Sequence, residues 1–252
     1  MRESSLPDTL FTLSWDDGHP LDVRLSRLLE KHGFPATFYI PLTNSEGLPV
    51  LSAQQIRELH RNGFEVGAHT LDHRYLPSLD DATARYQLVQ GKVQLEHVLG
   101  ESVPGFCYPG GRYEQKHKDM VRAAGFAYAR TTSNFHTEVL PDPFAMPAGF
   151  QCYPHPRSRF LRNFIRKGRW GQRIPLFSQA LFSRDLLSGL KGALDIVCAK
   201  GGVFHLWGHS WEVEKFDGWR VLDEFLVYAA QRIPAERRLT NINVLRARSV
   251  LP

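Results

Sequence analysis

The sequence predicts an α/β protein in which about seven parallel strands form a deformed (β/α) barrel. Short apolar runs alternate with amphipathic segments along most of the chain, and this alternation is typical of parallel strands joined by crossover helices. Polar residues follow several of the expected strands directly. Because side chains from successive strand ends meet at the C-terminal face of a β/α barrel, this placement favours a barrel over an open sheet.

The bulk composition fits a globular protein with an ordinary core. The 252 residues are 42% hydrophobic and 23% charged, with a formal net charge of +5. Such a charge does not by itself select between nucleic acid, membrane and phosphorylated partners. One basic stretch is the only further sign of nucleic-acid binding, so we expect no nucleic-acid partner. We expect one domain over residues 1–252, with an irregular basic insertion at about 150–180.

The cysteines and the first residues indicate a cytoplasmic protein. Cys107, Cys152 and Cys198 are far apart and form neither a disulfide framework nor a zinc knuckle. Residues 1–8 lack the apolar segment of a secretory signal. No stretch reaches the roughly 18 apolar residues of a membrane-spanning helix. The oligomeric state stays open.

Hydrophobic periodicity and turn residues predict the elements of the first half. Strands are expected at residues 10–15, 36–40, 64–68, 103–108 and 126–131. Helices are expected at 21–33, 52–63, 79–99 and 114–124. Ser52 suits the N-cap position of the second helix, and Gly33 suits the C-terminal end of the first.

The second half is less regular. The proline-rich residues 132–156 predict irregular chain with a short strand near 146–150. Residues 157–173 mix basic with aromatic and aliphatic side chains, as membrane-surface or phosphate-binding segments do. We expect instead a solvated insertion that covers part of the barrel. Helices are expected at 186–199 and 216–231, with a strand at 203–207 between them and no assigned structure in the tail.

Two adjacent carboxylates, Asp16 and Asp17, end the first expected strand just before Gly18. Neighbouring side chains on a strand point to opposite faces, so one carboxylate would enter the core if the strand continued. At the end of the strand both can converge on a site beyond the sheet. Asp-Asp-Gly alone is typical of a turn, and it predicts a site only if other strand ends supply partners.

His69 and His73 supply such partners directly after the third expected strand. Their i, i+4 spacing suits two ligands of one metal ion if the segment makes a helical turn. A carboxylate from Asp16 or Asp17 completes three ligands and leaves an open position for water. A metal in such a site lowers the pKa of bound water to about 7 and polarises a carbonyl. The set therefore indicates hydrolysis rather than a structural metal site.

The segments Ser14–Gly18, His69–His73 and Phe106–Gly111 together resemble the polysaccharide deacetylase family, the NodB-like carbohydrate esterase family 4. The family's first motif reads T-F-D-D-G, the second H-S/T-x-x-H, and the third carries a proline followed by Tyr or Gly. The order and the intervals also match over about residues 10–130, and the resemblance resumes near 201–211. It implies a deformed barrel, a bound divalent metal and hydrolysis of an N-acetyl group on an amino sugar.

The resemblance also implies how the polar residues divide their roles. Asp17, His69 and His73 would hold the metal, and Asp16 would be the general base that takes a proton from the attacking water. This ligand set suits Zn²⁺, with Co²⁺, Ni²⁺ or Fe²⁺ as alternatives.

The third motif would contribute the groups around the substrate. The backbone N–H of Gly110 would face the developing oxyanion. We place Tyr108, Pro109 and Trp207 on the oxyanion and substrate side of the site.

The general acid of the family is a late histidine after an apolar strand, and this chain offers His205 and His209. Within the expected strand, His205 would lie among apolar neighbours, where a satisfied core histidine is the alternative. His209 follows Gly208 at the end of the strand, so we favour it as the acid. We expect Glu212 either to orient an imidazole or bind substrate, or to be a solvated carboxylate at a helix start.

The chain departs from the family at the third and fourth motifs. Many members have an arginine two residues before the third-motif proline, where it steadies the base, and this chain has Cys107 there. Arg112 and Arg130 are candidates to replace it, and the alternative for each is a solvated surface arginine. Cys107 itself is interpreted as a small buried hydrophobe. No segment clearly matches the fourth motif.

The sequence therefore predicts a metal-dependent hydrolase that removes an N-acetyl group from an amino sugar or saccharide. The expected partner is a small-molecule or saccharide substrate, and the hypothesis includes peripheral contact with a membrane-linked sugar. One alternative is an amidase or deformylase acting on a non-polymeric small amide or a lipid-linked sugar. Another is a non-catalytic sugar-binding barrel, which the presence of both carboxylates and both histidines disfavours.

Overall fold

A computed structural model describes residues 8–139, 141–166, 168 and 170–251. Seven parallel strands form a curved half-barrel in the order β5-β4-β3-β2-β1-β7-β6, and β8 pairs with β1 off this path. The strands are β1 (Thr9–Asp16), β2 (Thr37–Ile40), β3 (Glu65–Ala68), β4 (Gly105–Cys107), β5 (Tyr128–Arg130), β6 (Phe150–Gln151), β7 (Gly202–Gly208) and β8 (Arg238–Leu239). The expected deformed barrel of about seven parallel strands is confirmed.

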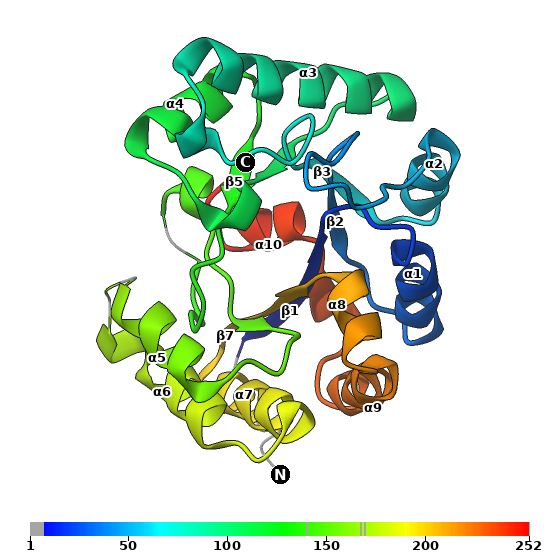
Figure 1. The fold of residues 1–252 in the computed structure, drawn as a ribbon. Coiled ribbons are helices and arrows are strands. Elements are labelled where there is room, and N and C mark those ends of the chain that lie inside the picture. The colour runs from blue at the N-terminus through cyan, green and yellow to red at the C-terminus, as the bar shows by residue number, and fades with distance from the viewer. Residues whose placement is uncertain (1–7, 140, 167, 169, 252) are drawn as a thin grey trace.

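Helices surround the sheet, most of them on its outer side, and α10 lies inside this ring in the view of Figure 1. They are α1 (Asp22–Lys31), α2 (Ala53–Arg61), α3 (Asp81–Leu99), α4 (Gln115–Ala123), α5 (Arg157–Arg166), α6 (Trp170–Phe182), α7 (Leu186–Lys200), α8 (Ser210–Lys215), α9 (Trp219–Ala230) and α10 (Asn241–Ala247). Ser52 caps α2 in a capping box with Gln55, as expected from its position. None of the helices in the described residues is long and apolar enough to cross a membrane.

The central strand β1 is buried over its whole length because it has neighbours on both edges and layers on both faces. On the outer face, the ring of Phe11 lies 5.0 Å from that of Phe34 and 5.2 Å from that of Phe204. Phe225 of α9 joins this cluster, with its ring 5.7 Å from that of Phe204. Stacked and tilted aromatic contacts of this kind fix the helices against the sheet.

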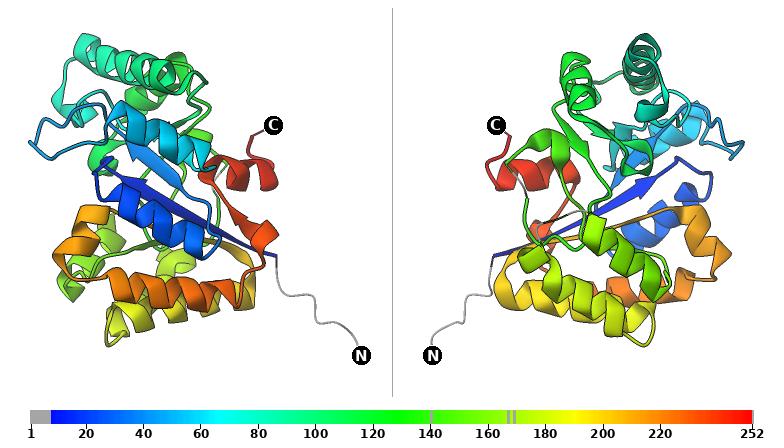
Figure 2. Two further views of the ribbon diagram at one scale, coloured as in Figure 1. Left: turned by 90° about the vertical axis from the view of Figure 1, so that its right-hand side faces the viewer. Right: turned by 60° about the vertical axis from the view of Figure 1, so that its left-hand side comes forward.

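The inner face of the sheet carries a polar layer instead. Tyr39 and Tyr128 join through their hydroxyls at 3.0 Å, and Tyr128 donates to Glu65 at 2.6 Å. Asn241 of α10 donates to the Tyr39 hydroxyl at 2.8 Å and accepts from Thr12 at 2.9 Å. These bonds hold α10 against the barrel end opposite to the strand arrowheads (Figure 2). The tail, which had no expected structure, therefore forms β8 and α10.

Two further sequence expectations need correction. The segment at about 150–180 is not irregular, because α5 and α6 pack against each other as a helix pair. The apolar residues of α5 do fall at helical spacing, but the density of basic residues favoured the interpretation as solvated irregular chain. The helix expected at 216–231 is α9, which begins only at Trp219, after a turn at Asp217 with a φ of 52°. The short helix α8 before this turn was not predicted from the sequence.

Candidate active site

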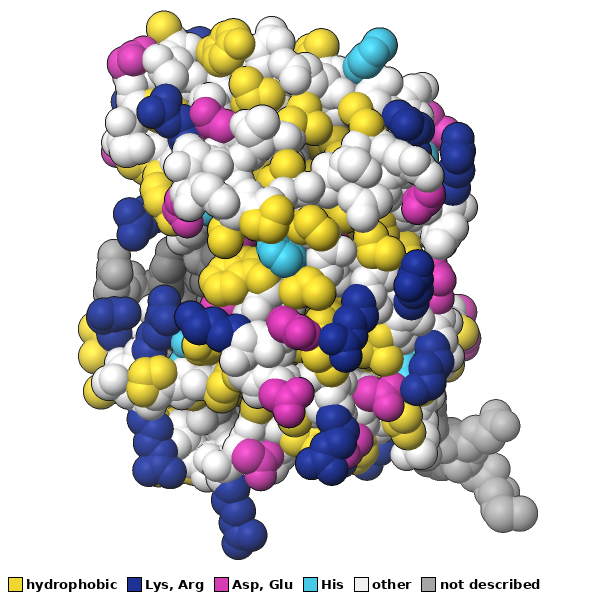
Figure 3. Space-filling model, turned by 45° about the vertical axis from the view of Figure 1, so that its right-hand side comes forward, with side chains coloured by type: hydrophobic (Ala, Val, Ile, Leu, Met, Phe, Trp, Pro, Cys, Tyr) yellow, Lys and Arg dark blue, Asp and Glu magenta, His cyan; other side chains and the backbone are white. Residues whose placement is uncertain are grey.

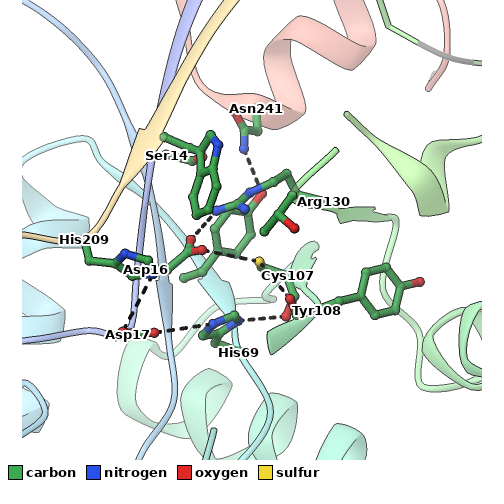
Figure 4. A network of polar contacts seen from close by, with 12 residues as sticks. Ser14, Asp16, Asp17, His69, Cys107, Tyr108, Arg130, His209 and Asn241 are labelled. Atoms are coloured by element: carbon green, nitrogen blue, oxygen red, sulfur yellow. Dashed lines mark hydrogen bonds and ion pairs between the residues drawn. The ribbon is translucent and has the colours of Figure 1, made fainter. Parts of the chain in front are cut away.

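A pocket of about 1030 Å³ opens over the C-terminal ends of the strands. Asp16 and Asp17 come from the end of β1, His69 and His73 follow β3, and His209 follows β7. Figure 4 shows how the labelled members of this group converge. The prediction that polar residues after separate strands meet at one place is therefore correct in its geometry.

The backbone sends the two neighbouring carboxylates to different surroundings. β1 ends at Asp16, and Asp17 takes a left-handed conformation with a φ of 76°. Aspartate tolerates this region better than most residues. Gly18 also has a positive φ, and a Cβ there would lie 2.7 Å from the Ile40 side chain. The chain therefore turns sharply enough for both side chains to stay buried in one site.

Asp17 lies among three imidazoles. Its Oδ1 is 3.1 Å from Nε2 of His73 and 3.6 Å from Nε2 of His69, while its Oδ2 is 3.8 Å from Nε2 of His209. The indole of Trp211 donates to Oδ2 at 2.9 Å. Burial alone raises the pKa of Asp17, but the hydrogen bond with His73 and the nearby histidine charges hold it well below its usual range.

His69 and His73 do not meet through a helical turn, as the sequence analysis expected. The segment is a tight turn in which Thr70 and His73 both have a φ of 61°. Thr70 Oγ1 accepts from the backbone N–H of Arg74 at 3.1 Å and stabilises the turn. The two rings lie 5.0 Å apart, so the pair reaches a ligand-like arrangement through left-handed backbone rather than through i, i+4 spacing.

A divalent ion fits between these three side chains. The ligand atoms of Asp17, His69 and His73 all lie within 4.8 Å of one another. Asp17 Oδ1 is buried and faces Nε2 of both imidazoles. His69 Nδ1 lies 2.8 Å from the carbonyl of Cys107, which leaves Nε2 turned toward the site. Two imidazoles and one carboxylate are ligands typical of zinc.

Asp16, His69 and Cys107 form a second group whose ligand atoms lie within the same distance. Here the carboxylate already has a partner, since Arg130 forms a buried ion pair with Asp16 Oδ1. Burial raises the pKa of the Cys107 thiol well above its ordinary value, which disfavours the thiolate that a metal needs. The residues present therefore fit a metal better at Asp17 than at Asp16.

Arg130 is the arginine that holds Asp16. Its side chain is fully buried, and its guanidinium lies 5.2 Å from the ring centre of Tyr39 and 5.0 Å from that of Trp207. Burial lowers the pKa of Arg130, but the charge of Asp16 more than compensates and keeps the guanidinium protonated. Of the two candidates named from the sequence, Arg112 instead lies over the Tyr75 ring, 4.7 Å from its centre.

His209 and Glu212 form a pair beside Asp17. Nδ1 of His209 lies 2.6 Å from Glu212 Oε2. Burial lowers the pKa of His209, but the bond to Glu212 and the charge of Asp17 raise it to about 9. His205 lies beneath the pocket, with Nε2 2.8 Å from Ser14 Oγ and Nδ1 3.2 Å from the Pro147 carbonyl. It has the environment of a satisfied core histidine.

A chain of hydrogen bonds extends from Glu212 to α5. Gln151 donates to Glu212 at 3.2 Å, and His155 lies 2.7 Å from the Gln151 side-chain oxygen. Arg159 of α5 lies 3.4 Å from the other ring nitrogen of His155. Gln151 and His155 were not predicted from the sequence, because no motif marks residues that contact the site only through a neighbour.

The third-motif residues lie partly in the pocket and partly outside it. Gly110 lines the pocket, as does Trp207, whose indole donates to Asn134 at 2.6 Å. Tyr108 points away from the site (Figure 4): its hydroxyl donates to the carbonyl of Phe144 at 3.1 Å. The prediction that Tyr108 faces substrate is therefore wrong, since the strand pleat turns it into the core. Pro109 is buried and does not line the pocket.

Gly110 makes room for an aromatic ring from another loop. A Cβ at Gly110 would lie 2.8 Å from Cε1 of Tyr75. The Tyr75 hydroxyl donates to Glu46 at 2.9 Å, and both residues line the pocket. Tyr75, Glu46 and Trp211 lie outside the three motifs and were not predicted from the sequence. Proximity to His73 and His209 along the chain is the only sequence signal that could have found the two aromatic residues.

Comparison with known proteins gives one family. The family model described as polysaccharide deacetylase matches residues 3–129, half of the chain. YxkH of Bacillus subtilis (strain 168), named for the same family, is 22% identical over 125 residues. The match covers 50% of this chain and 42% of that relative, so the chain spans less than half of the relative's length.

Two solved structures share the fold over nearly the whole chain. One is a Mycobacterium smegmatis protein named for polysaccharide deacetylases, with a TM-score of 0.67, 16% identity, and coverage of 100% of this chain and 95% of that chain. The other is Puue allantoinase, with a TM-score of 0.64, 15% identity, and coverage of 95% and 89%. At these identities the likeness establishes the architecture and not the substrate.

Proposed function

The chain belongs to the polysaccharide deacetylase family, and from this membership we propose that it is a hydrolase that removes an N-acetyl group from an amino sugar. One observation carries the proposal. Asp17 Oδ1 lies buried between the Nε2 atoms of two imidazoles, directly beside a second carboxylate that an arginine holds. This arrangement combines a three-ligand metal site with a separate base, which amide hydrolysis requires.

Asp17, His69 and His73 would hold a divalent ion, with zinc the first choice for this donor set. When bound, the ion would polarise the amide carbonyl and make water easier to deprotonate. Trp211 donates to the far oxygen of Asp17 and fixes the direction in which the carboxylate points.

Asp16 is the base in this proposal. Arg130 occupies one oxygen of its carboxylate, so the carboxylate is held in one orientation. Oδ2 lies 3.8 Å from the thiol of Cys107, a weak partner that leaves this oxygen available for a proton from the attacking water. Asp16 also lines the pocket directly, where the attacking water would lie.

His209 is the acid that protonates the leaving amine. It lines the pocket, and the bond to Glu212 keeps its imidazole protonated at neutral pH, in the state that can donate. The backbone N–H of Gly110, across the same pocket, is the donor that we assign to the oxyanion. The residues of the chain thus supply a base, an acid and an oxyanion donor.

The pocket favours a saccharide over a small compact amide. Its volume of about 1030 Å³ exceeds what an acetamide or a cyclic ureide would fill. Tyr75, Tyr113, Trp207 and Trp211 line it together with polar side chains. Flat aromatic faces beside hydrogen-bonding groups suit the alternating apolar and polar faces of sugar rings.

Acetate release from a panel of substrates tests the proposal. Zinc-loaded protein should release acetate from N-acetylglucosamine oligomers and from N-acetylated glycosides, and Asp16→Asn should abolish the release. Allantoin and small formamides serve as competing substrates. Turnover of these amides with no acetate from any N-acetyl sugar would contradict the proposal.

A further inference from the structure

The helix pair α5–α6 carries basic charge without any acidic residue. Between Asp142 and Asp185 the sequence contains no aspartate or glutamate. Its basic residues from residue 157 onward are Arg157, Arg159, Arg162, Arg166, Lys167, Arg169, Arg173 and Arg184. By contrast, the face shown in Figure 3 mixes acidic and basic side chains over its lower half. A one-sign segment of this length attracts anionic partners.

The same helix pair exposes large apolar side chains. Leu161 and Ile165 of α5 are 48% and 57% exposed, and Trp170 and Ile174 of α6 are 56% and 50% exposed. The Trp170 indole donates to the Ile165 carbonyl at 3.4 Å, so the two helices bring these side chains together. We call these four residues the α5–α6 surface. Phe182, 74% exposed, extends the exposed apolar area to the end of α6.

The opposite face of the helix pair is already used. Phe164 and Phe177 stack with ring centres 4.1 Å apart, and both Phe160 and Phe177 contact Phe135. Arg173 is fully buried and donates to the backbone carbonyls of Asn134, Phe164 and Gly168. These contacts fix which face points outward, so a small rotation of α5 or α6 cannot hide the α5–α6 surface.

We propose that the α5–α6 surface docks the protein on an anionic lipid bilayer. Interfacial helices combine Trp, Phe or Leu on one side with basic residues on the other. Here α5 supplies leucine, isoleucine and arginine, and α6 supplies Trp170. On α5, Leu161 and Ile165 occupy one flank, while Arg159 and Arg162 occupy another. Lipid headgroups supply the negative charge that this segment lacks, and the acyl boundary accepts its apolar side chains.

Docking at this surface brings a bilayer next to the pocket. Arg159, Arg162 and Asn163 of α5 line the pocket, one helical flank away from Leu161 and Ile165. Figure 2 shows the helix pair at the margin of the barrel (right-hand view). Where the proposed deacetylase function holds, its substrate class is then a saccharide linked to a membrane lipid, whose phosphate would lie within reach of Arg159 and Arg162.

Helix α3 offers a matched control. Tyr86, Val89 and Val93 are 56%, 41% and 51% exposed and lie along one stripe of α3. This helix also contains Asp81 and Glu96 beside its basic residues, and Tyr86, Val89 and Val93 do not line the pocket. A triple change to serine there removes similar apolar area without touching the α5–α6 surface.

Vesicle sedimentation tests the proposal with full-length protein. Vesicles of phosphatidylcholine with an equal amount of phosphatidylglycerol should bind the protein, whereas vesicles of phosphatidylcholine alone should not. Leu161→Ser combined with Ile165→Ser and Ile174→Ser should weaken binding about tenfold. The α3 triple variant should bind like the natural protein, and higher ionic strength should release both.

Several results would overturn the proposal. The first is that the protein sediments with neither kind of vesicle. The second is that the α5–α6 variant binds vesicles as well as the natural protein does. The third is that the α3 variant loses as much vesicle binding as the α5–α6 variant. A concentration-dependent dimer that only the α5–α6 variant loses would also overturn it, because a second copy would then cover the surface. Acetate release from a water-soluble N-acetylated glycoside should be unchanged in both triple variants. If neither the natural protein nor either triple variant released acetate, the proposed function would be rejected. The vesicle measurement would still test the docking proposal by itself.

Discussion

Arg130 reaches Asp16 from a different strand than the arginine that many family members place at the position of Cys107. In this chain Cys107 and Arg130 are paired across β4 and β5, so they lie at the same level of the sheet. Moving an arginine by one strand therefore keeps it within reach of the same carboxylate. Because Cys107 is small, the guanidinium of Arg130 can pass beside it between the rings of Tyr39 and Trp207.

This exchange leads to a substitution test. Arg130→Ala should lower acetate release about 10- to 100-fold, because Asp16 loses the group that orients it. It should also lower the free energy of unfolding by about 3 kcal/mol, since a buried carboxylate is left unpaired. Activity and chemical denaturation measure the two effects.

The double variant Cys107→Arg with Arg130→Ala provides the control. It returns the arginine to the position that many family members use, next to Asp16 Oδ2. We expect it to recover part of the activity and of the stability. Equal activity in the natural protein and Arg130→Ala would show that Asp16 needs no arginine.

Among the elements, helix α3 supports the turn that carries the two histidines. Gln87 accepts from the backbone N–H groups of Leu71 and Asp72, both at 3.2 Å. Gly91 lies directly against the same turn, where a Cβ would be 2.9 Å from the Thr70 carbonyl carbon. The spacing in the sequence correctly predicted that His69 and His73 lie close together. It could not reveal that α3, which follows later in the chain, supports the turn with its left-handed residues Thr70 and His73.

Gly91→Ala should therefore change the free energy of unfolding in the opposite direction to an ordinary glycine-to-alanine substitution in a helix. Alanine in an exposed helix stabilises by up to about 1 kcal/mol relative to glycine. At residue 91 the contact with the backbone of Thr70 should instead destabilise the fold by about 1–3 kcal/mol and weaken zinc binding. Thermal unfolding and zinc titration measure this.

Gly171→Ala is the matched change, because a Cβ there meets nothing within 4 Å. It should be neutral or slightly stabilising and should leave zinc binding unchanged. Stabilisation by Gly91→Ala to the same extent would contradict the close packing of α3 on the turn.

Glu96, near the C-terminal end of α3, should make the stability of the fold depend on pH. Burial raises the pKa of Glu96, but donation from Lys92 and from the backbone N–H of Val103 outweighs burial and lowers it. The folded state therefore favours the ionised carboxylate. Its contribution is fully present above the ordinary glutamate pKa of about 4.3 and is lost as the pH falls through the lowered value.

Glu96→Gln should cost about 1 kcal/mol of unfolding free energy at pH 7 and close to nothing at pH 2. Denaturant unfolding of both proteins at a series of pH values gives the comparison. A difference that stays constant from pH 7 to pH 2 would assign the effect to packing rather than to charge.

For the whole molecule, hydrophobic periodicity was sufficient to predict where the main strands lie along the chain and that the polar residues at their ends meet. It failed where the deciding contacts join residues far apart in sequence. Asn241 holds α10 against the barrel through Tyr39 and Thr12, and no local pattern in the tail records those partners. Tyr108 was assigned to the site because it lies within the third motif, whereas the extended chain directly after β4 turns its ring toward Phe144.

The segment at 157–182 illustrates the same limit at the surface. Its composition allowed either a solvated insertion or a membrane-binding arm, because charge alone does not say which side chains are covered. The buried anchor at Arg173 and the exposed Leu161 and Ile165 resolve which face points outward. The location of the helix pair beside the pocket then connects the surface to the proposed chemistry.

The division of roles between the two adjacent carboxylates is the central claim, and zinc titration of two variants, with acetate release measured on the same samples, tests it most directly. Asp16→Asn should bind one zinc ion per chain as the natural protein does, yet release no acetate. Asp17→Asn should lose zinc binding, because Asp17 is the carboxylate that faces His69 and His73. Loss of zinc by Asp16→Asn with retention by Asp17→Asn would contradict the assignment.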